Sequence, residues 1–242
     1  MDIRTRTASA PRTKRLSVPL DSVPQMRPIK ASGFDPWDLT LGGMPPGLSF
    51  VRGAPAFTFA LAAAAKVIDA DVDDAGVQPE VLIVGFATEP ELARTCADRA
   101  GLSASRSRLF RSSDDLEGVL EAIEYERPRA VIFDSAMELD NRLSSRRKWQ
   151  QMAQLRQACW DRGVSAIVCG DWDFVRKRPV GLPTVPAPQA ILLHPLPETV
   201  GPWGLFLVAV HRSEWLYRRA SERGVVVQLD EFGVALLPDP DA

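Results

Sequence analysis

The chain has 242 residues, of which 45% are hydrophobic and 25% are charged, and its formal net charge is −2. This composition excludes a fully disordered, collagen-like or disulfide-dense chain, and the length suffices for one large domain or two small ones. No apolar run approaches the roughly 20 residues of a transmembrane helix, and the N-terminus lacks the apolar stretch of a secretory signal. We therefore expect a cytoplasmic protein without membrane contact.

Charge separates the first 30 residues from the rest of the chain. Residues 1–30 hold seven Lys or Arg and two Asp, a formal charge of +5, which leaves −7 for the remainder. They have no sustained apolar period and cannot bury enough surface to offset chain entropy. We expect a disordered basic arm over 1–30 that contacts a polyanion or an acidic protein surface, or stays a solvated tail. One domain is expected over 31–242.

Side chains that commonly hold metals are few. The cysteines Cys96, Cys159 and Cys169 show no CxxC spacing, and two of them lie in apolar settings, which favours reduced core thiols. His194 and His211 are not at the spacing of metal ligands. We expect no metal site and no cofactor.

From residue 31 onward, apolar runs and helical patterns alternate. Short apolar runs predict strands at 48–51, 81–84, 108–110, 130–133 and 164–169. Helical patterns and capping residues predict helices at 56–70, 89–100, 114–126 and 145–162. Strands that are apolar on both faces and alternate with helices predict an α/β fold, with a mostly parallel sheet covered by helices on both faces.

The pattern changes after residue 175. Residues 176–203 are basic and then proline-rich, which predicts a long loop around a short strand at 190–193. Apolar runs then predict closing antiparallel strands at 205–210, 215–219, 225–229 and 233–237.

Four segments, in this order, resemble motifs of the RecA superfamily, in particular its RadA/Sms and DnaB-like branch. They are an entry motif (SGFDPWDLTLGG, 32–43), the position of the phosphate loop (FVRGAPAFTFA, 50–60), a strand and helix without gaps (81–102), and a Walker B-like strand (AVIFDS, 130–135). The resemblance covers residues 31–237 and implies a RecA-like fold. The alternative is an ordinary α/β domain whose likeness to a phosphate loop is accidental.

The phosphate-loop position departs from the working pattern G-x-x-x-x-G-K-[ST]. Counted from Gly53, Thr58 stands at the second Gly, Phe59 at the Lys and Ala60 at the Ser/Thr. Phe and Ala cannot neutralise phosphate charge or hold Mg²⁺, and we expect Phe57 and Phe59 to place aromatic bulk into or beside the phosphate pocket. Thr58 is expected to resist the positive φ of a loop glycine. Of the Walker residues only Asp134 remains, so the sequence predicts a pseudo-ATPase with a degenerate phosphate loop.

The resemblance also implies where nucleic acid would bind, because RecA-like proteins contact it through the loops after the Walker B strand and after the next strand. Both corresponding segments here are basic. The first holds Arg142, Arg146, Arg147 and Lys148, with Trp149 beside them. The second holds Arg176, Lys177 and Arg178, after Trp172 and Phe174. Cations that neutralise phosphates, mixed with aromatics that stack on bases, suit single-stranded DNA. The alternative is a solvated basic face.

The sequence therefore predicts a catalytically inactive RecA/RadA-like accessory protein of DNA recombination, repair or replication. It would bind single-stranded DNA, or a protein partner with a RecA fold or polymerase function, and it could form homo- or hetero-oligomers. A looser likeness links it to the ImuA-type accessories of mutagenic repair, which also lack a proper phosphate loop. Two alternatives stay open: a regulator of an active RecA-like oligomer without DNA contact, and an ATPase with an unorthodox nucleotide site.

Overall fold

The computed structural model describes residues 32–69, 80–103, 105–110, 116–143, 146–182, 189–197, 199–201, 203–213, 224–230 and 233–237. The basic arm over 1–30 and the strand expected at 215–219 lie outside these residues. Asp114 and Asp115, expected to cap a helix, also lie outside them.

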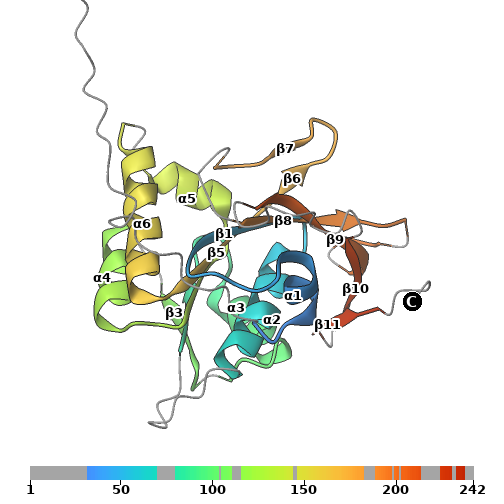
Figure 1. The fold of residues 1–242 in the computed structure, drawn as a ribbon, viewed down its shortest axis with the longest axis horizontal. Helices are drawn as coiled ribbons and strands as arrows, with labels where there is room; N and C mark the ends of the chain where they lie inside the picture. Colours follow the sequence, from blue (N-terminus) through green and yellow to red (C-terminus); the bar gives the residue numbers. More distant parts are fainter. Residues whose placement is uncertain are drawn as a thin grey trace, which may run out of the picture.

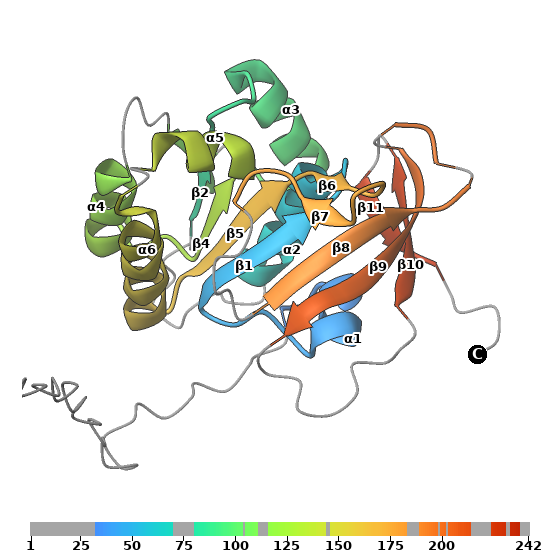
Figure 2. The same cartoon turned by 90° about the horizontal axis from the view of Figure 1, so that it is seen from above.

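Within the described residues, nine strands form one sheet in the order β11-β10-β9-β8-β1-β5-β4-β2-β3 (Figures 1 and 2). Their bounds are β1 Gly47–Arg52, β2 Val81–Val84, β3 Ser107–Phe110, β4 Ala130–Phe133, β5 Ser165–Gly170, β8 Gln189–Pro195, β9 Gly204–Ser213, β10 Val225–Asp230 and β11 Gly233–Leu236.

The centre of the sheet is parallel and its C-terminal end is antiparallel. Strands β8, β1, β5, β4, β2 and β3 run parallel, with Ser49 opposite Ile167 between β1 and β5. Strands β9, β10 and β11 then pair antiparallel, beginning on β8. Strands β1, β2 and β4 are buried along their whole length, which explains the continuous apolar runs of β2 and β4. The predicted α/β fold class is confirmed.

Helices cover both faces of this sheet (Figure 1). One apolar core joins one face of the sheet to α1 (Asp35–Leu41), α2 (Ala56–Asp69) and part of α3 (Pro90–Arg99). The other joins the opposite face to α4 (Glu117–Tyr125), α5 (Ala136–Arg142) and α6 (Lys148–Arg162). The alanines of α2 let it lie close against the strands, since nine of its residues are buried. Gly163 ends α6 in the left-handed conformation, as its sequence position predicts.

Three elements were not expected from the sequence. Residues within the entry motif form α1, whose Trp37 indole donates a hydrogen bond to the buried Gln189 Oε1 (3.2 Å). The helix expected at 145–162 begins at Lys148, and a separate helix, α5, precedes it. Ser135 caps α5 by accepting a hydrogen bond from the Glu138 N–H (3.2 Å), a local signal that was missed.

The third unexpected element is a short hairpin, whose second strand falls inside the region 176–203 predicted to be a long loop. It pairs β6 (Trp172–Asp173) with β7 (Arg178–Pro179) in antiparallel fashion. Asp173 Oδ1 accepts a hydrogen bond from the Arg176 N–H (2.9 Å), and Lys177 adopts a left-handed φ of 50°. This turn contains no glycine, which is why its sequence does not look like a hairpin.

Candidate functional site: a short turn and a basic hairpin at one edge of the sheet

The turn from β1 into α2 is shorter than a phosphate loop. Only Gly53, Ala54 and Pro55 separate the last residue of β1 from the first residue of α2. The Gly53 N–H donates to the Gly170 carbonyl (2.8 Å), and the Ala56 N–H donates to the Gly53 carbonyl (3.0 Å). Gly53 has a φ of 126°, and a Cβ there would lie 2.6 Å from the Leu193 carbonyl oxygen. The chain therefore enters the helix immediately, without a backbone span that could surround a phosphate.

Because the helix begins early, the residues aligned with the phosphate-binding positions lie within it. Thr58 is helical, so the backbone strain expected for it does not arise. Phe59 is 0% exposed and packs against Phe34 and Trp37, with ring centroids 5.1 and 6.2 Å apart. The expectation that Phe59 lies in or beside the phosphate pocket is wrong, since its ring packs in the core against Phe34 and Trp37. Ala60 is also buried.

A cavity of about 100 Å³ lies beside this turn. Phe57 lines it, as expected from the sequence. Its other walls are Gly53, Ala54, Ala56, Asp134, Ser135, Met137, Cys169, Gly170, Asp171 and Val180. Small-molecule pockets usually have volumes of about 300–1,000 Å³, so this cavity is well below the usual size. Burial raises the pKa of the Cys169 thiol well above its ordinary value, and the thiol faces the Ala56 carbonyl at 3.6 Å.

Asp134 at the end of β4 organises a neighbouring loop. Its Oδ1 accepts a hydrogen bond from the Phe86 N–H (2.9 Å). Its Oδ2 accepts from the Ala87 N–H (3.0 Å) and the Thr88 N–H (2.6 Å). Both carboxylate oxygens thus bind the loop between β2 and α3, and charge-assisted bonds of this kind are among the stronger ones in proteins.

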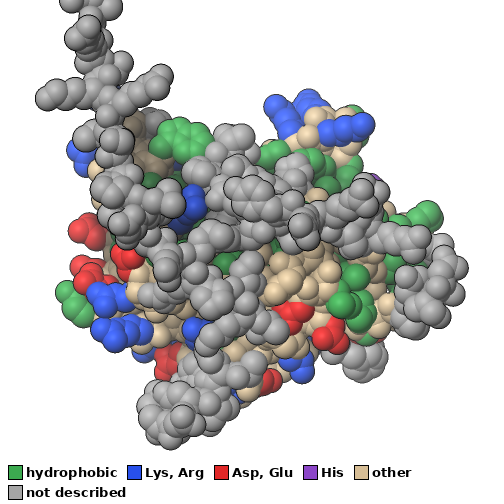
Figure 3. Space-filling model, viewed as in Figure 1, with side chains coloured by type: hydrophobic (Ala, Val, Ile, Leu, Met, Phe, Trp, Pro, Cys, Tyr) green, Lys and Arg blue, Asp and Glu red, His purple; other side chains and the backbone are tan. Residues whose placement is uncertain are grey.

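The β6–β7 hairpin projects from the same edge of the sheet, where the parallel strands end (Figure 1). Its cationic residues Arg176, Lys177 and Arg178 are all exposed, and their side chains gather at its end in Figure 3. Between them and β6, Val175 is 93% exposed. The hairpin therefore presents three cations and an apolar side chain to solvent.

The hairpin touches the end of β8 through an aromatic contact. Phe174 packs on His194 with ring centroids 4.9 Å apart. Beyond β8 the chain turns back into β9, and at this turn Val200 pairs with Trp203 in an isolated β-bridge. Both side chains are exposed, Val200 at 78%. We call the surface of Phe174, Val175, Arg176, Lys177, Arg178 and His194 the hairpin surface.

The other predicted cations lie in different settings. Arg142, at the end of α5, lies over the Phe86 ring at 4.8 Å and is half-buried. Lys148 forms an ion pair with Asp140 at 2.5 Å. Arg146 and Arg147 are exposed before α6. The cations of the second basic segment, 176–178, thus lie together on one projecting element. In the first segment, two cations contact other side chains of the domain and two are exposed to solvent.

Comparison with known proteins yields a structural likeness alone. No family model and no curated protein matches the chain. A solved KaiC-like protein from the hyperthermophilic archaeon Pyrococcus horikoshii OT3 matches at a TM-score of 0.61 and 15% identity, covering 87% of this chain and 100% of that one. That protein has the fold of the RecA superfamily. The fold is RecA-like. At such low identity the likeness extends to the fold and not to chemistry.

Arg52 is the residue of this RecA-like fold that sequence reasoning missed. It ends β1, directly before Gly53, and is only 4% exposed. Its guanidinium donates to the carbonyls of Val180 (Nη1, 3.0 Å) and Leu182 (Nη2, 2.9 Å) and lies 4.6 Å from the centre of the Phe50 ring. Burial lowers its pKa to about 10, so it is charged at neutral pH. A cation at the end of a strand that is buried along its whole length was the signal that could have revealed it.

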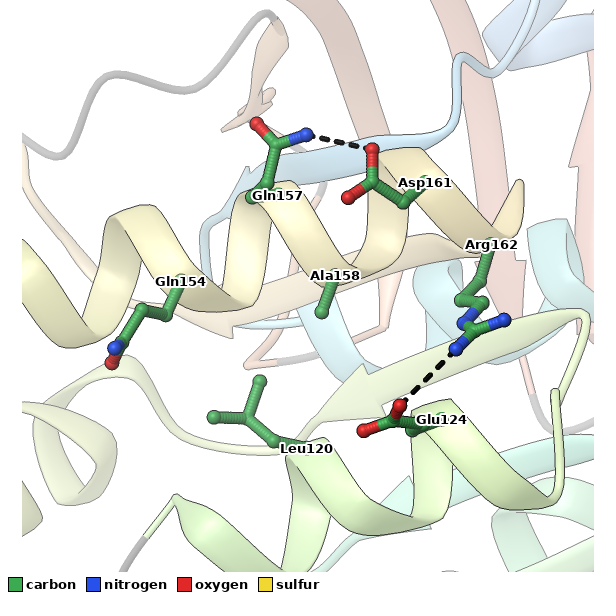
Figure 4. A pocket seen from close by; sticks show the side chains of 7 residues that line it. All are labelled: Leu120, Glu124, Gln154, Gln157, Ala158, Asp161 and Arg162. Atoms are coloured by element: carbon green, nitrogen blue, oxygen red, sulfur yellow. Dashed lines mark hydrogen bonds and ion pairs between the residues drawn. The ribbon is translucent and has the colours of Figure 1, made fainter.

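A larger cavity lies away from these residues, between α4 and α6. It has a volume of about 420 Å³ and is bounded by the Arg162–Glu124 ion pair (3.2 Å) and by Gln157, which donates to Asp161 (2.7 Å) (Figure 4). None of the predicted site residues lines it. Among the described residues no group of three or more His, Cys, Asp or Glu is placed to hold a metal ion, and no helix is long and apolar enough to cross a membrane.

Proposed function

We propose that this chain is a RecA-like protein without ATP hydrolysis, which binds single-stranded nucleic acid through the hairpin surface. In this role it would act as an accessory in DNA recombination, repair or replication. The observation that carries the proposal is the β6–β7 hairpin, which exposes Arg176, Lys177 and Arg178 beside aromatic side chains at the edge where the parallel strands end. Open α/β sheets usually bind ligands at this edge.

The residues at the β1–α2 turn do not fit a magnesium-bound nucleotide. The positions of the Lys and the Ser/Thr hold Phe59 and Ala60, both buried in the core. Asp134 already accepts three backbone hydrogen bonds. The neighbouring cavity of about 100 Å³ is much smaller than a nucleotide pocket. Phosphoryl transfer depends almost wholly on positioning and charge stabilisation, so a site without these groups has no means to perform it.

The hairpin surface has the two properties that single-strand binding requires. Three exposed cations, of which Arg176 also forms an ion pair with Asp173 (3.8 Å), can neutralise phosphates and release counterions, which makes binding depend on salt. The ring of Phe174, which is 36% exposed, offers a face for an unpaired base, and such stacking contributes about 1–3 kcal/mol per base. A duplex hides its bases and would use the cations alone.

A binding experiment tests this proposal directly. A fluorescently labelled single strand and a duplex of the same length are titrated with the full chain at about 50 mM salt, where the counterion term is strong, with and without ATP and Mg²⁺. We expect tighter binding to the single strand, no effect of ATP, and no release of phosphate. Equal affinity for the duplex would contradict the claim that aromatic side chains stack on unpaired bases. Absence of binding to both the single strand and the duplex would show that nucleic acid is not the ligand.

The second candidate is a regulator that binds an active RecA-like oligomer without touching nucleic acid. The observation that favours it is the exposure of Val175 on the hairpin and of Val200 on the β8–β9 turn, at 93% and 78%, because exposed apolar side chains can serve protein contacts. This candidate becomes the leading one if the single strand does not bind.

A further inference from the structure

The β6–β7 hairpin is too short to hold its own position. Each strand has two residues, and isolated two-stranded hairpins are at best marginally stable in water. At its tip it is held by the contact between Phe174 and His194. At its base one more backbone bond, from the Val180 N–H to the Asp171 carbonyl (3.1 Å), extends the pairing. Beyond these contacts and its connection to β5, the direction of the hairpin depends on what holds residues 180–182, which follow it.

Residues 180–182, which we call the strap, follow the hairpin directly and are held from two sides. From the sheet, the Arg52 guanidinium donates to the first and last carbonyls of the strap. From the helix side, the middle residue Gly181 lies against α5, where an added Cβ would be 2.7 Å from the Met137 backbone. Its φ of 81° also requires a residue that tolerates the left-handed conformation.

The sheet leaves room for Arg52 to reach the strap. A Cβ on Gly170 would lie 2.4 Å from Arg52 Nη1, so the guanidinium passes over this glycine at the end of β5. A buried cation is a costly way to stabilise a fold, because apolar residues of similar volume often give equal or greater stability. The guanidinium instead fixes positions, because its planar group donates to two carbonyls at once and holds both in place.

We propose that Arg52 is a positioning residue, which holds the strap and thereby keeps the β6–β7 hairpin in the orientation that binds single-stranded nucleic acid. This inference rests on the proposed function of the hairpin surface. In this arrangement a fixed side chain at the end of β1 sets the hairpin, and no nucleotide is needed to order it. Without the fork the hairpin samples other orientations, and the apparent affinity falls with the fraction that is competent to bind.

The variant Arg52→Lys tests this inference because it keeps the charge and loses the planar fork. We expect about tenfold weaker binding of the labelled single strand, as the loss of one charge-assisted bond predicts. Hydrogen exchange in residues 172–182 should become about tenfold faster. The dependence of binding on salt should not change, because the cations that contact phosphate remain.

Arg106→Lys is the matched control. Arg106 also donates to a backbone carbonyl, that of Ile68 at 2.7 Å, and it forms an ion pair with Asp69, but it is remote from the hairpin in sequence and contacts. This variant should lose comparable thermal stability and keep the wild-type affinity. If Arg52→Lys does not fold, Gly181→Ala displaces the strap without changing any charge and should give the same loss of affinity and faster exchange.

Two results separate this inference from the proposed function. If Arg52→Lys and Gly181→Ala bind the single strand as tightly as the wild type does, the positioning role of Arg52 is refuted. The proposal that the hairpin surface binds the single strand is then unaffected. If the wild type does not bind a single strand, the proposed function fails, and hydrogen exchange alone decides whether Arg52 orders the hairpin. Unchanged exchange in 172–182 refutes the role in either case.

Discussion

The β1–α2 turn and the β6–β7 hairpin lie at the same edge of one sheet, yet they have opposite character. The turn is three residues long and leads into a helix whose Phe59 is fully buried. The hairpin projects outward and exposes Val175 and three cations. Both segments lie on the same RecA-like sheet, so the fold alone does not determine which chemistry this edge can perform. Loops at the strand ends determine it, as in other widely shared folds.

The difference has a physical basis in what each segment packs against. The turn is enclosed by backbone, since Gly53 approaches the Leu193 carbonyl closely and donates to the Gly170 carbonyl. The hairpin has one aromatic contact at its tip and the strap at its base. We therefore expect substitutions at the turn to affect stability and substitutions at the hairpin to affect binding.

Replacing Phe59 should have the largest effect on stability. Phe→Ala changes in cores cost about 3–5 kcal/mol, and burying an amine adds to that cost. Phe59→Lys should thus destabilise the fold by at least about 4 kcal/mol instead of restoring a phosphate-binding lysine. Urea denaturation measures this. Phe57→Lys is the matched control, since its half-buried side chain lines the small cavity and should cost much less. Equal costs for the two would mean that the orientation of α2 is wrong.

Asp134→Asn should have the next largest effect. An amide keeps one acceptor oxygen but turns its NH₂ toward backbone N–H groups, so bonds to Ala87 and Thr88 are lost. A hydrogen bond to a charged group is worth about 1.5–3 kcal/mol, and because the two lost bonds share one oxygen we expect less than twice that value, about 2–4 kcal/mol. Thermal unfolding measures it, with and without millimolar Mg²⁺. A melting temperature that rises with Mg²⁺ in the wild type and not in the variant would instead assign a metal to Asp134.

The three thiols report whether the turn opens. Burial raises the pKa of Cys159 to about 12 and that of Cys169 well above its ordinary value, so both stay protonated at pH 8. Cys96 is only half-buried, although burial raises its pKa as well. In a reaction with a disulfide reagent at pH 8, we expect Cys96 to react first and Cys169 only on unfolding. Fast labelling of Cys169, located by mass spectrometry, would show that the cavity beside the turn opens widely.

Removing the basic arm should have the smallest effect on stability. A chain that begins at Ala31 should keep its melting temperature within a few degrees, because residues 1–30 have no apolar pattern to contribute to a core. Its affinity for a single strand should fall, since a charge of +5 is lost. A large drop in melting temperature would mean that the arm packs on the domain.

Much of this fold could be predicted from local pattern, while the site could be predicted only in part. Apolar runs identified the parallel strands, and the strand at 130–133 was located to the residue. The second strand of the hairpin falls in a region whose composition predicts a loop, and its turn has no glycine to indicate a hairpin. Alignment to the motif puts Phe59 in or beside a phosphate pocket because it does not show which face of α2 packs on the core. The role of Arg52 depends on carbonyls 128 and 130 residues away, which no local pattern contains.

The most direct test of the central claim is a salt titration of single-strand binding by fluorescence anisotropy. It compares the wild type with a variant in which Arg176, Lys177 and Arg178 are all alanine, from about 50 to 200 mM salt. Each lost phosphate contact on a single strand reduces the magnitude of the slope of log affinity against log salt by about 0.7. The slope of the triple variant should therefore be smaller in magnitude by about 2. Its melting temperature should not change. An equal slope in the two proteins, or no binding by the wild type at about 50 mM salt, would contradict the account.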